Sequence, residues 1–405
     1  MKSIRDLYKI GKGPSSSHTI GPERAAHLLK ERYPDADRYT VVLYGSLSKT
    51  GQGHGTDRVL HTVLSPTPTE VVFSEEPLGQ TYTHPNTMDL YAWHGEERSP
   101  RLRVESIGGG DIRVEGCAAM EPPEVYPENS FAEIADFCRL RNLTLWEYVE
   151  INEGPEIWDF LAGIWQTMQE AIDAGIATEG VLPGGLGVER KAKTLYEKVI
   201  ENEFTALREC RIVSAYAYAV SEQNADCGTI VTAPTCGACG VLPAVLRYLK
   251  ERRKLTDEKV LQALAVAGLF GSLIKRNASI SGAECGCQAE IGSACAMAAA
   301  AACVLCDLNT AQTQYAAEIA LEHHLGLTCD PICGLVQIPC IERNAVAASR
   351  ALNCLNLAFI LSDTQRITFD MVVKTMYETG IHLSQQYRET AEGGLAKLYG
   401  RRSRR

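Results

Sequence analysis

The segment Glu121-Pro-Pro-Glu-Val-Tyr-Pro-Glu-Asn129 separates two parts of the chain that have different hydrophobic patterns. It holds three prolines and has no periodicity, and Ser130-Phe-Ala-Glu133 directly after it is a capping-box sequence that opens a helix. A chain of 405 residues is long enough for two or three domains. We therefore expect an α+β fold, with an α/β sandwich-like domain over residues 1–122 and an all-helical catalytic domain over residues 130–400.

Before this segment, the pattern is mostly strand-like, with short apolar runs between Gly, Pro and Thr turns. Strands are expected at 40–45, 70–73, 89–93 and 101–106, and short helices at 22–32 and 57–64. Two Gly-containing stretches, 44–50 and 106–111, lack the spacing of nucleotide-binding loops. We interpret both as tight turns in the sheet.

After it, apolar residues recur with the 3.6-residue period of helices. The expected helices cover residues 158–174, 192–219, 258–276, 289–307, 311–324, 343–360 and 369–387.

The composition favours an enzyme that acts on a small molecule. The net charge of −10 comes with neither an acidic tail nor a basic stripe, so nucleic acid and an anionic membrane surface are poor partners. Residues 1–11 lack the apolar run of a secretory signal, and the apolar stretch 294–305 is too short to cross a bilayer. We expect a cytoplasmic protein, with 294–305 as a buried helix, and we expect a homodimer.

Cysteine placement indicates a metal centre. Nine of the fifteen cysteines lie between Cys285 and Cys354, and in a reducing compartment such residues are thiols or metal ligands rather than disulfides.

Three of these cysteines lie in polar, Gly- or Pro-marked segments close to helix starts: Cys287, Cys329 and Cys340. Cysteines near helix N-termini ionise more easily, and the thiolate is the form that binds metal. Three separated thiolates could hold three irons of a 4Fe-4S cluster and leave the fourth iron open, as a Lewis-acid catalyst requires.

Spacing alone does not select these three cysteines. Cys303 and Cys306 form a C-x-x-C that we interpret as core packing. Cys236 and Cys239 form another on a turn that could suit zinc or redox chemistry.

A hydroxyl-rich run, Gly13-Pro-Ser-Ser-Ser-His-Thr-Ile-Gly21, precedes the first expected helix. Hydroxyls and helix N-terminal amides suit a small anion such as a substrate carboxylate, and His18 could move a proton. The alternative is ordinary capping by Thr19 in a solvated loop. His54 and His84 lie on similar Gly- or Pro-marked loops, whereas His61, His323 and His324 fall in helical patterns and are expected to be packing or surface residues.

Several unusual short motifs make this sequence resemble the iron–sulfur-dependent L-serine dehydratases, the bacterial L-serine ammonia-lyases. The motifs occur in the same order as in that family. The resemblance covers nearly the whole chain. It rests on Gly13–Pro22, Tyr44-Gly-Ser-Leu-Ser48, Gly53-His-Gly-Thr-Asp57, Ser106-Ile-Gly-Gly-Gly110, Thr178–Gly184, Asn277–Glu284, Gly326–Pro331 and Pro339–Ala345.

The resemblance implies roles for particular residues. It places the cluster ligands at Cys287, Cys329 and Cys340. It places the catalytic and substrate-binding loops of the β domain at Ser15, Ser16, Ser17, His18 and Thr19, at His54, and more loosely at His84 with Asn86.

The chain also departs from this family. Some single-chain relatives end in a cysteine that reaches the cluster, whereas this sequence ends Arg401-Arg-Ser-Arg-Arg405, so a resting state with the tail in the site is in doubt. Cys236, Cys285 and Cys333 are extra thiols, any of which could be a fourth ligand or inert. The β domain is shorter than in the longest relatives.

The expected reaction is the dehydration and deamination of L-serine to pyruvate and ammonia. The open iron would bind the β-hydroxyl, the loop of Ser15 to Thr19 would hold the carboxylate, and His18, His54 or His84 would remove the α-proton. Alternatives are the same chemistry on threonine or cysteine, a non-catalytic iron–sulfur sensor, and a purely regulatory role for the N-terminal domain. Pyridoxal phosphate would need a lysine in a phosphate-binding loop, and the sequence offers no convincing one.

Overall fold

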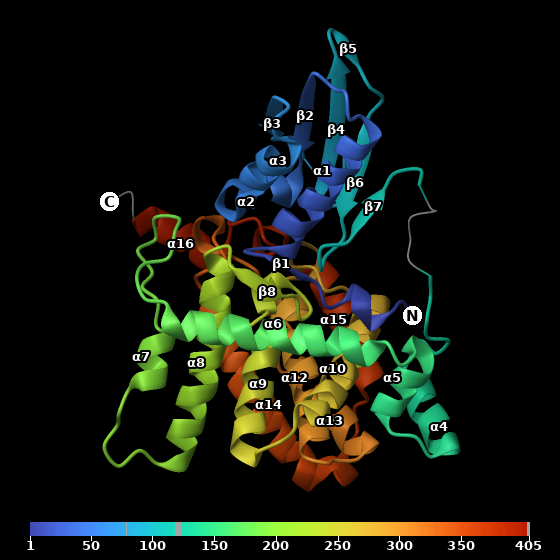
Figure 1. Ribbon diagram of the computed structural model, residues 1–405, viewed down its shortest axis with the longest axis vertical. Coiled ribbons are helices and arrows are strands. Elements are labelled where there is room, and N and C mark those ends of the chain that lie inside the picture. The colour runs from blue at the N-terminus through green and yellow to red at the C-terminus, as the bar shows by residue number, and fades with distance from the viewer. Residues whose placement is uncertain (78, 118–122, 403–405) are drawn as a thin grey trace.

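A mixed sheet with helices packed against it forms the upper part of the molecule in Figure 1. The computed structural model describes residues 1–77, 79–117 and 123–402. Among these residues the sheet has the strand order β3-β2-β4-β6-β7, with β5 paired to β4. β2 and β3 are parallel, and the other neighbouring strands are antiparallel. The strands are β2 (Arg38–Leu43), β3 (Thr69–Phe73), β4 (Thr87–His94), β5 (Glu97–Arg98), β6 (Leu102–Ser106) and β7 (Ile112–Val114).

Alternation along the strands gives the sheet one apolar face. In β2 the side chains of Tyr39, Val41 and Leu43 are buried, while their neighbours are more exposed. Helices α1 (Gly21–Arg32), α2 (Gly45–His54) and α3 (Thr56–Leu64) contribute apolar residues to the same core. The four strands and two helices expected here from the sequence are confirmed, as is the mixed α+β class.

One of the two expected turns is wrong. Residues 107–111 do form the turn between β6 and β7, with positive φ at Gly108, Gly109 and Gly110. Residues 45–54, however, form helix α2. Gly45 starts this helix with φ +53, and a side chain there would lie 2.4 Å from the carbonyl oxygen of Pro85. The glycine therefore permits the close approach of the helix start to the neighbouring loop.

The lower part of Figure 1 is a helical domain built around the Ala-rich helix α12 (Ser293–Leu305). α12 is almost entirely buried, as expected, and packs against α9, α10, α13 and α14. The other helices are α4 (Phe131–Arg141), α5 (Leu145–Glu153), α6 (Ile157–Ala177), α7 (Ala192–Glu197), α8 (Thr205–Ala225), α9 (Val241–Arg253), α10 (Asp257–Asn277), α11 (Gly282–Cys285), α13 (Thr310–Glu322), α14 (Cys340–Leu361), α15 (Phe369–His382) and α16 (Gly394–Arg402). The shorter elements are η1 (Ile4–Asp6), η2 (Ser16–Ile20), η4 (Cys236–Ala238), η5 (Gln288–Gly292), η6 (Ile332–Gly334), η7 (Ser362–Thr364), η8 (Gln385–Tyr387), β1 (Ile10–Lys12) and β8 (Thr229–Val231).

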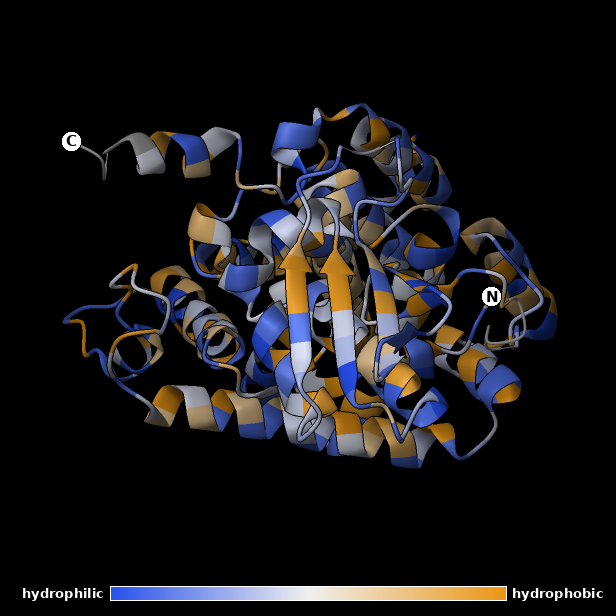
Figure 2. Ribbon diagram, turned by 90° about the horizontal axis from the view of Figure 1, so that it is seen from above, coloured by the Kyte–Doolittle hydropathy of each residue, from blue (hydrophilic) through white to orange (hydrophobic). Residues whose placement is uncertain are grey.

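The capping box and the 3.6-residue apolar period predicted most of these helices. The side chain of Ser130 accepts from the amide of Glu133, and the Glu133 side chain reaches back to the amide of Ser130, so α4 begins as expected. α6 has the banded hydropathy of an amphipathic helix in Figure 2. The single helix expected over 192–219 is wrong, because residues 198–204 interrupt it and Asn202 has φ +58.

The N-terminal segment joins the two domains. Met1, Ile4, Leu7 and Tyr8 belong to the core of the helical domain, and β1 pairs antiparallel with β8. These residues fall in the first expected domain, but their contacts are with the second.

The carboxylate of Asp111, on the turn after β6, ties this junction together. It is ion-paired with the ammonium group of Lys9, with that of Lys275 on α10 at 2.5 Å, and with the guanidinium of Arg24 at 3.1 Å. Three segments that are distant in sequence therefore meet at one carboxylate. The proposed boundary at residue 122 and the terminal residues 403–405 lie outside the described residues.

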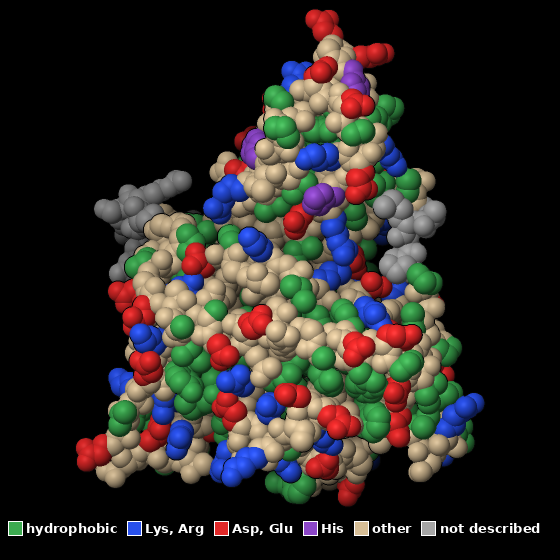
Figure 3. Space-filling view, viewed as in Figure 1, with side chains coloured by type: hydrophobic (Ala, Val, Ile, Leu, Met, Phe, Trp, Pro, Cys, Tyr) green, Lys and Arg blue, Asp and Glu red, His purple; other side chains and the backbone are tan. Residues whose placement is uncertain are grey.

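Two helical stretches, Gln288–Leu305 and Cys340–Thr364, are long and apolar enough to cross a membrane by length and composition alone. The first is 89% buried inside the molecule and the second 44%, so the first is a core helix of this fold. On the face shown in Figure 3, acidic and basic side chains are interspersed.

Candidate active site between the two domains

His18 is fully buried at the junction of the two domains and is surrounded by hydroxyls. It lies in η2, directly before α1, and the Ser15 side chain caps this turn by accepting from the His18 amide. The ring nitrogen Nδ1 lies 3.0 Å from the hydroxyl of Ser17, and Nε2 lies 2.9 Å from that of Thr50 and 3.1 Å from that of Ser46. Burial, followed by the neighbouring His54, lowers the pKa of His18, so its ring is neutral.

His54 stacks on His18 from the end of α2, with ring centroids 4.3 Å apart. Its Nδ1 lies 2.9 Å from the carbonyl oxygen of Thr50, an acceptor, so Nδ1 carries the proton and Nε2 presents a lone pair. Nε2 is buried and has no hydrogen-bond partner among the described residues. Burial lowers the pKa of His54 to about 4.

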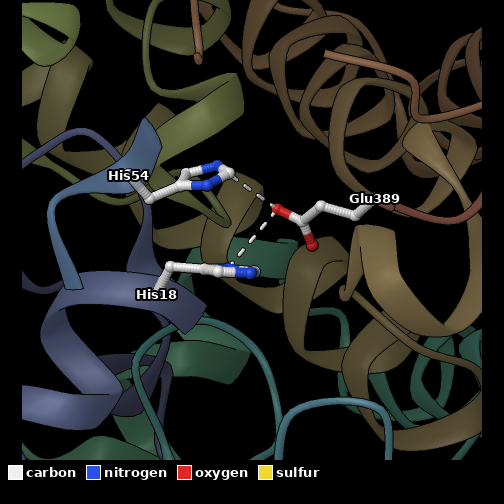
Figure 4. A group of neighbouring side chains, drawn as sticks. All are labelled: His18, His54 and Glu389. Atoms are coloured by element: carbon white, nitrogen blue, oxygen red, sulfur yellow. Dashed lines mark ion pairs between the residues drawn. The ribbon is translucent and has the colours of Figure 1, made fainter. Parts of the chain in front are cut away.

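Glu389 faces both imidazoles from the other domain, as Figure 4 shows. Its Oε1 atom lies 3.6 Å from Nδ1 of His18 and 3.8 Å from Nε2 of His54. The three side chains are buried, and their ligand atoms lie close enough together to hold a metal ion. Glu389 could not be selected from the sequence, because it follows η8 in a stretch without a metal or acid–base motif, 335 residues after His54.

A cavity of about 570 Å³ opens beside this group. It is lined by residues of both domains, among them Ser46, His84, Glu284 and Arg388. His84 therefore lines the same cavity as Ser46, whose hydroxyl contacts His18. Its Nδ1 accepts a hydrogen bond from the amide of Asn86, at 3.1 Å.

Among the other residues expected to bind substrate, Asn86 has buried hydrogen-bonding groups that are unused. Its side chain is completely buried, and both amide atoms lack a partner in the described part of the chain. By contrast, the Ser15 and Ser17 hydroxyls contact His18, and Thr19 donates to the carbonyl oxygen of Ser15. Ser16 is buried in the same turn. The loop is thus packed between the domains, and the solvated alternative is wrong.

Cys287, Cys329 and Cys340 are brought together under this site. The thiols of Cys287 and Cys329 form a hydrogen bond, which lowers the pKa of Cys287 to about 6 and raises that of Cys329. Burial raises the pKa of Cys340, and the nearby charge of Cys287 adds to the effect. Cys329 is also linked to Glu389, because the Glu389 amide donates to the Cys329 carbonyl oxygen at 2.8 Å.

Two further side chains surround the cysteines. The charge of Arg343 on α14 acts on all three thiols, and its guanidinium hydrogen-bonds to Cys287 and to the carbonyl oxygen of Thr328, the latter at 2.6 Å. Glu290 lies 4.0 Å from the Cys329 sulfur, and burial raises its pKa to about 8. Both were missed from the sequence, although each follows a proposed ligand by three residues on a helix.

The donor set fits an iron–sulfur cluster. Thiolates are the usual ligands of such clusters, and a facing guanidinium balances their charge. Gly282 keeps space beside them, because a Cβ there would lie 3.2 Å from the Cys329 sulfur and 2.6 Å from Oε2 of Glu290. A cluster could therefore be held by Cys287, Cys329 and Cys340.

The remaining cysteines are placed differently. Cys333 is exposed. Cys285 faces α15, where a Cβ on Gly380 would lie 2.7 Å from its sulfur. Cys236 and Cys239 are fully buried around η4. Cys303 lies in the core, which confirms that it is a packing residue.

Comparison with known proteins gives matches to two serine dehydratase families along the chain. Residues 93–396 match the family described as serine dehydratase alpha chain, and residues 3–77 match serine dehydratase beta chain. The L-serine dehydratase TdcG of Escherichia coli is 40% identical, over 98% of this chain and 99% of that protein. An L-serine dehydratase of Haemophilus influenzae is 40% identical over the same shares, and one of Helicobacter pylori is 35% identical over 98% of both chains.

Proposed function

This chain belongs to the serine dehydratase family, and from that premise we propose that it is a lyase that converts L-serine to pyruvate and ammonia with a 4Fe-4S cluster. The observation that carries the proposal is the gathering of two buried thiols and the partly buried thiol of Cys340 around Arg343, one hydrogen bond away from the Glu389 that faces His18 and His54. The proposed metal ligands and acid–base groups would thereby share one site between the two domains.

The cluster would be held by Cys287, Cys329 and Cys340. When bound, it supplies a Lewis acid that turns the β-hydroxyl of serine into a better leaving group.

The chain's own residues account for the proton transfer. His54 is the best-placed base, because its Nδ1 is fixed on the Thr50 carbonyl oxygen and its Nε2 lone pair is unused. Its neutral state suits the removal of the α-proton. His18 is held by hydroxyls on both nitrogens, so we assign it to orienting His54 through the stacked rings. His84 on the cavity wall could pass protons to solvent.

Substrate contacts follow from the hydrogen bonds that the chain leaves unused. The free amide of Asn86 can donate to the substrate carboxylate, and burial excludes water that would compete. The loop of Ser15, Ser16, Ser17 and Thr19, which is packed around His18, would supply further contacts to the substrate carboxylate. After water leaves, the enamine product tautomerises and hydrolyses to pyruvate and ammonia without further catalysis.

We also propose a cytoplasmic homodimer with a small-molecule substrate and neither nucleic acid nor membrane as a partner. Exposed apolar side chains on α14 support association, namely Val346, Phe359, Ile360 and Leu361. Light scattering under argon would measure the mass; a monomer at micromolar concentration would contradict the dimer.

Anaerobic purification tests the proposed function. The protein should be brown, contain about four irons per chain and release pyruvate from L-serine, and exposure to air should remove both the colour and the activity. Colourless protein with full activity would refute the cluster mechanism. A stable cluster with no lyase activity would favour an iron–sulfur sensor.

A further inference from the structure

Glu389 is held rigidly by contacts to both domains. Its amide donates to the carbonyl oxygen of Cys329 at 2.8 Å, and its own carbonyl oxygen accepts from the Ser46 hydroxyl at 2.7 Å. Its backbone lies in the left-handed region with φ +56, where a non-glycine residue is uncommon. The carboxylate therefore has a defined position against the histidines.

This carboxylate lacks a cation. Glu389 is only 5% exposed, and Oε2 has no hydrogen-bond partner among the described residues. Within 4.0 Å, the described part of the chain offers its oxygens two groups that could become positive, His18 and His54, and burial keeps both neutral. Burial, followed by the nearby Glu290 carboxyl and Cys287 thiol, raises the pKa of Glu389, and a hydrogen bond from the amide of Ala283 opposes this effect.

Two other buried carboxylates of the described residues are paired with arginines, whereas buried Glu318 has an unpartnered Oε1 of its own. Asp89 accepts two hydrogen bonds of 2.7 Å from Arg103, and Asp330 lies 3.5 Å from Arg343. A buried carboxyl oxygen that has neither a hydrogen-bond donor nor a counter-charge is unfavourable, so its presence at this position needs a reason. A cation that is present only during turnover would supply one.

We propose that Oε2 of Glu389 binds the α-ammonium group of the amino-acid substrate, an inference that rests on the proposed function. The ammonium group supplies the missing positive charge and donors for the unpartnered oxygen. Because Oε1 of the same carboxylate lies 3.8 Å from Nε2 of His54, an ammonium group held here places the adjacent α-carbon next to the proposed base. Glu389 would thus select α-amino acids over acids that lack the amine.

Two ligands that differ only in the amine test this assignment: L-serine and 3-hydroxypropionate. In the Glu389→Gln holoenzyme, the dissociation constant of L-serine should rise at least about 30-fold, the effect of removing one partner of a buried charge pair. That of 3-hydroxypropionate should change less than about threefold, because this ligand makes no such pair. Glu392→Gln is the matched control, since Glu392 is exposed and pairs with Lys49 at 2.9 Å.

The constants come from KM and inhibition constants where turnover persists, and from anaerobic calorimetry where it does not. Equal weakening of both ligands, or unchanged L-serine binding, would overturn the assignment. If Glu389→Gln loses its iron, Glu389→Asp decides, because it keeps the charge: it should still prefer L-serine, and loss of that preference would also overturn the assignment. Wild-type protein that neither binds L-serine nor makes pyruvate would instead refute the proposed function.

Discussion

Replacing Asp111 by Asn should destabilise the junction between the domains. Burial alone would raise the pKa of Asp111, but the charges of Lys9 and Lys275 outweigh it and lower the pKa to about 2 from 3.8. At about 1.4 kcal/mol for each pH unit, this lowering corresponds to about 2 kcal/mol of stability at neutral pH. The neutral amide would also leave the buried Lys9 without its counter-charge, so we expect a loss of at least about 2 kcal/mol.

The stability that Asp111 contributes should decrease as the pH falls. Because the folded pKa lies below the unfolded one, the contribution of Asp111 is complete above pH 3.8 and declines as the pH falls towards 2. About 1 kcal/mol of it should be gone by pH 3. The Asp111→Asn variant should not show this loss of stability between pH 3.8 and pH 2.

Urea unfolding at pH 7, followed by tryptophan fluorescence under argon, measures the difference. Asp136→Asn is the control, because Asp136 is 69% exposed in its pair with Arg139 and such pairs contribute about 0–1 kcal/mol. The reasoning is refuted if Asp111→Asn unfolds at the same urea concentration as the wild type, or if both proteins lose stability equally between pH 4 and pH 3.

Three further outcomes are expected. His54→Gln should lower kcat at least about 100-fold with unchanged iron content, because it removes the proposed base but no ligand; unchanged kcat would assign the base elsewhere. Cys340→Ser should lower the iron content per chain, measured after anaerobic reconstitution, whereas Cys210→Ser at an exposed position should not; equal iron in both would exclude Cys340 as a ligand. Asp89→Ala should cost about 3–5 kcal/mol in urea unfolding, because it leaves the Arg103 guanidinium buried and unpaired; a cost below about 1 kcal/mol would contradict that account.

Local signals in the sequence were sufficient to predict most of the fold. The Ser130–Glu133 capping box, the alternation in β2 and the long apolar periods each depend on neighbours within a few residues, and they are confirmed except for the helix over 192–219, which residues 198–204 interrupt. Helix α2 was misjudged because its glycines suggested a turn, whereas Gly45 is required by the loop at Pro85, 40 residues away in sequence. Such a requirement is invisible to local patterns.

The candidate site also contains residues that local sequence signals reveal and a residue that they do not. Unusual sequence motifs contain His18, His54 and the three cysteines, so these residues could be selected from the sequence. Glu389 could not, because a lone Glu is typical of any surface, and its significance comes only from burial against two histidines of another domain. Whether the selected residues carry the assigned roles stays a prediction for the experiments above.

The pairing of β1 with β8 has a consequence during synthesis. Ile10 pairs with Val231, so its partner emerges from the ribosome 221 residues later. Until then Met1, Ile4 and Leu7 have no helical core to enter. The sheet of β2 to β7, whose strands are close in sequence, can form first, and the N-terminal segment is then captured when β8 and α10 are complete. Because that capture also fixes residues 13–21 beside His54, the nascent chain would acquire its substrate pocket at a late step of folding.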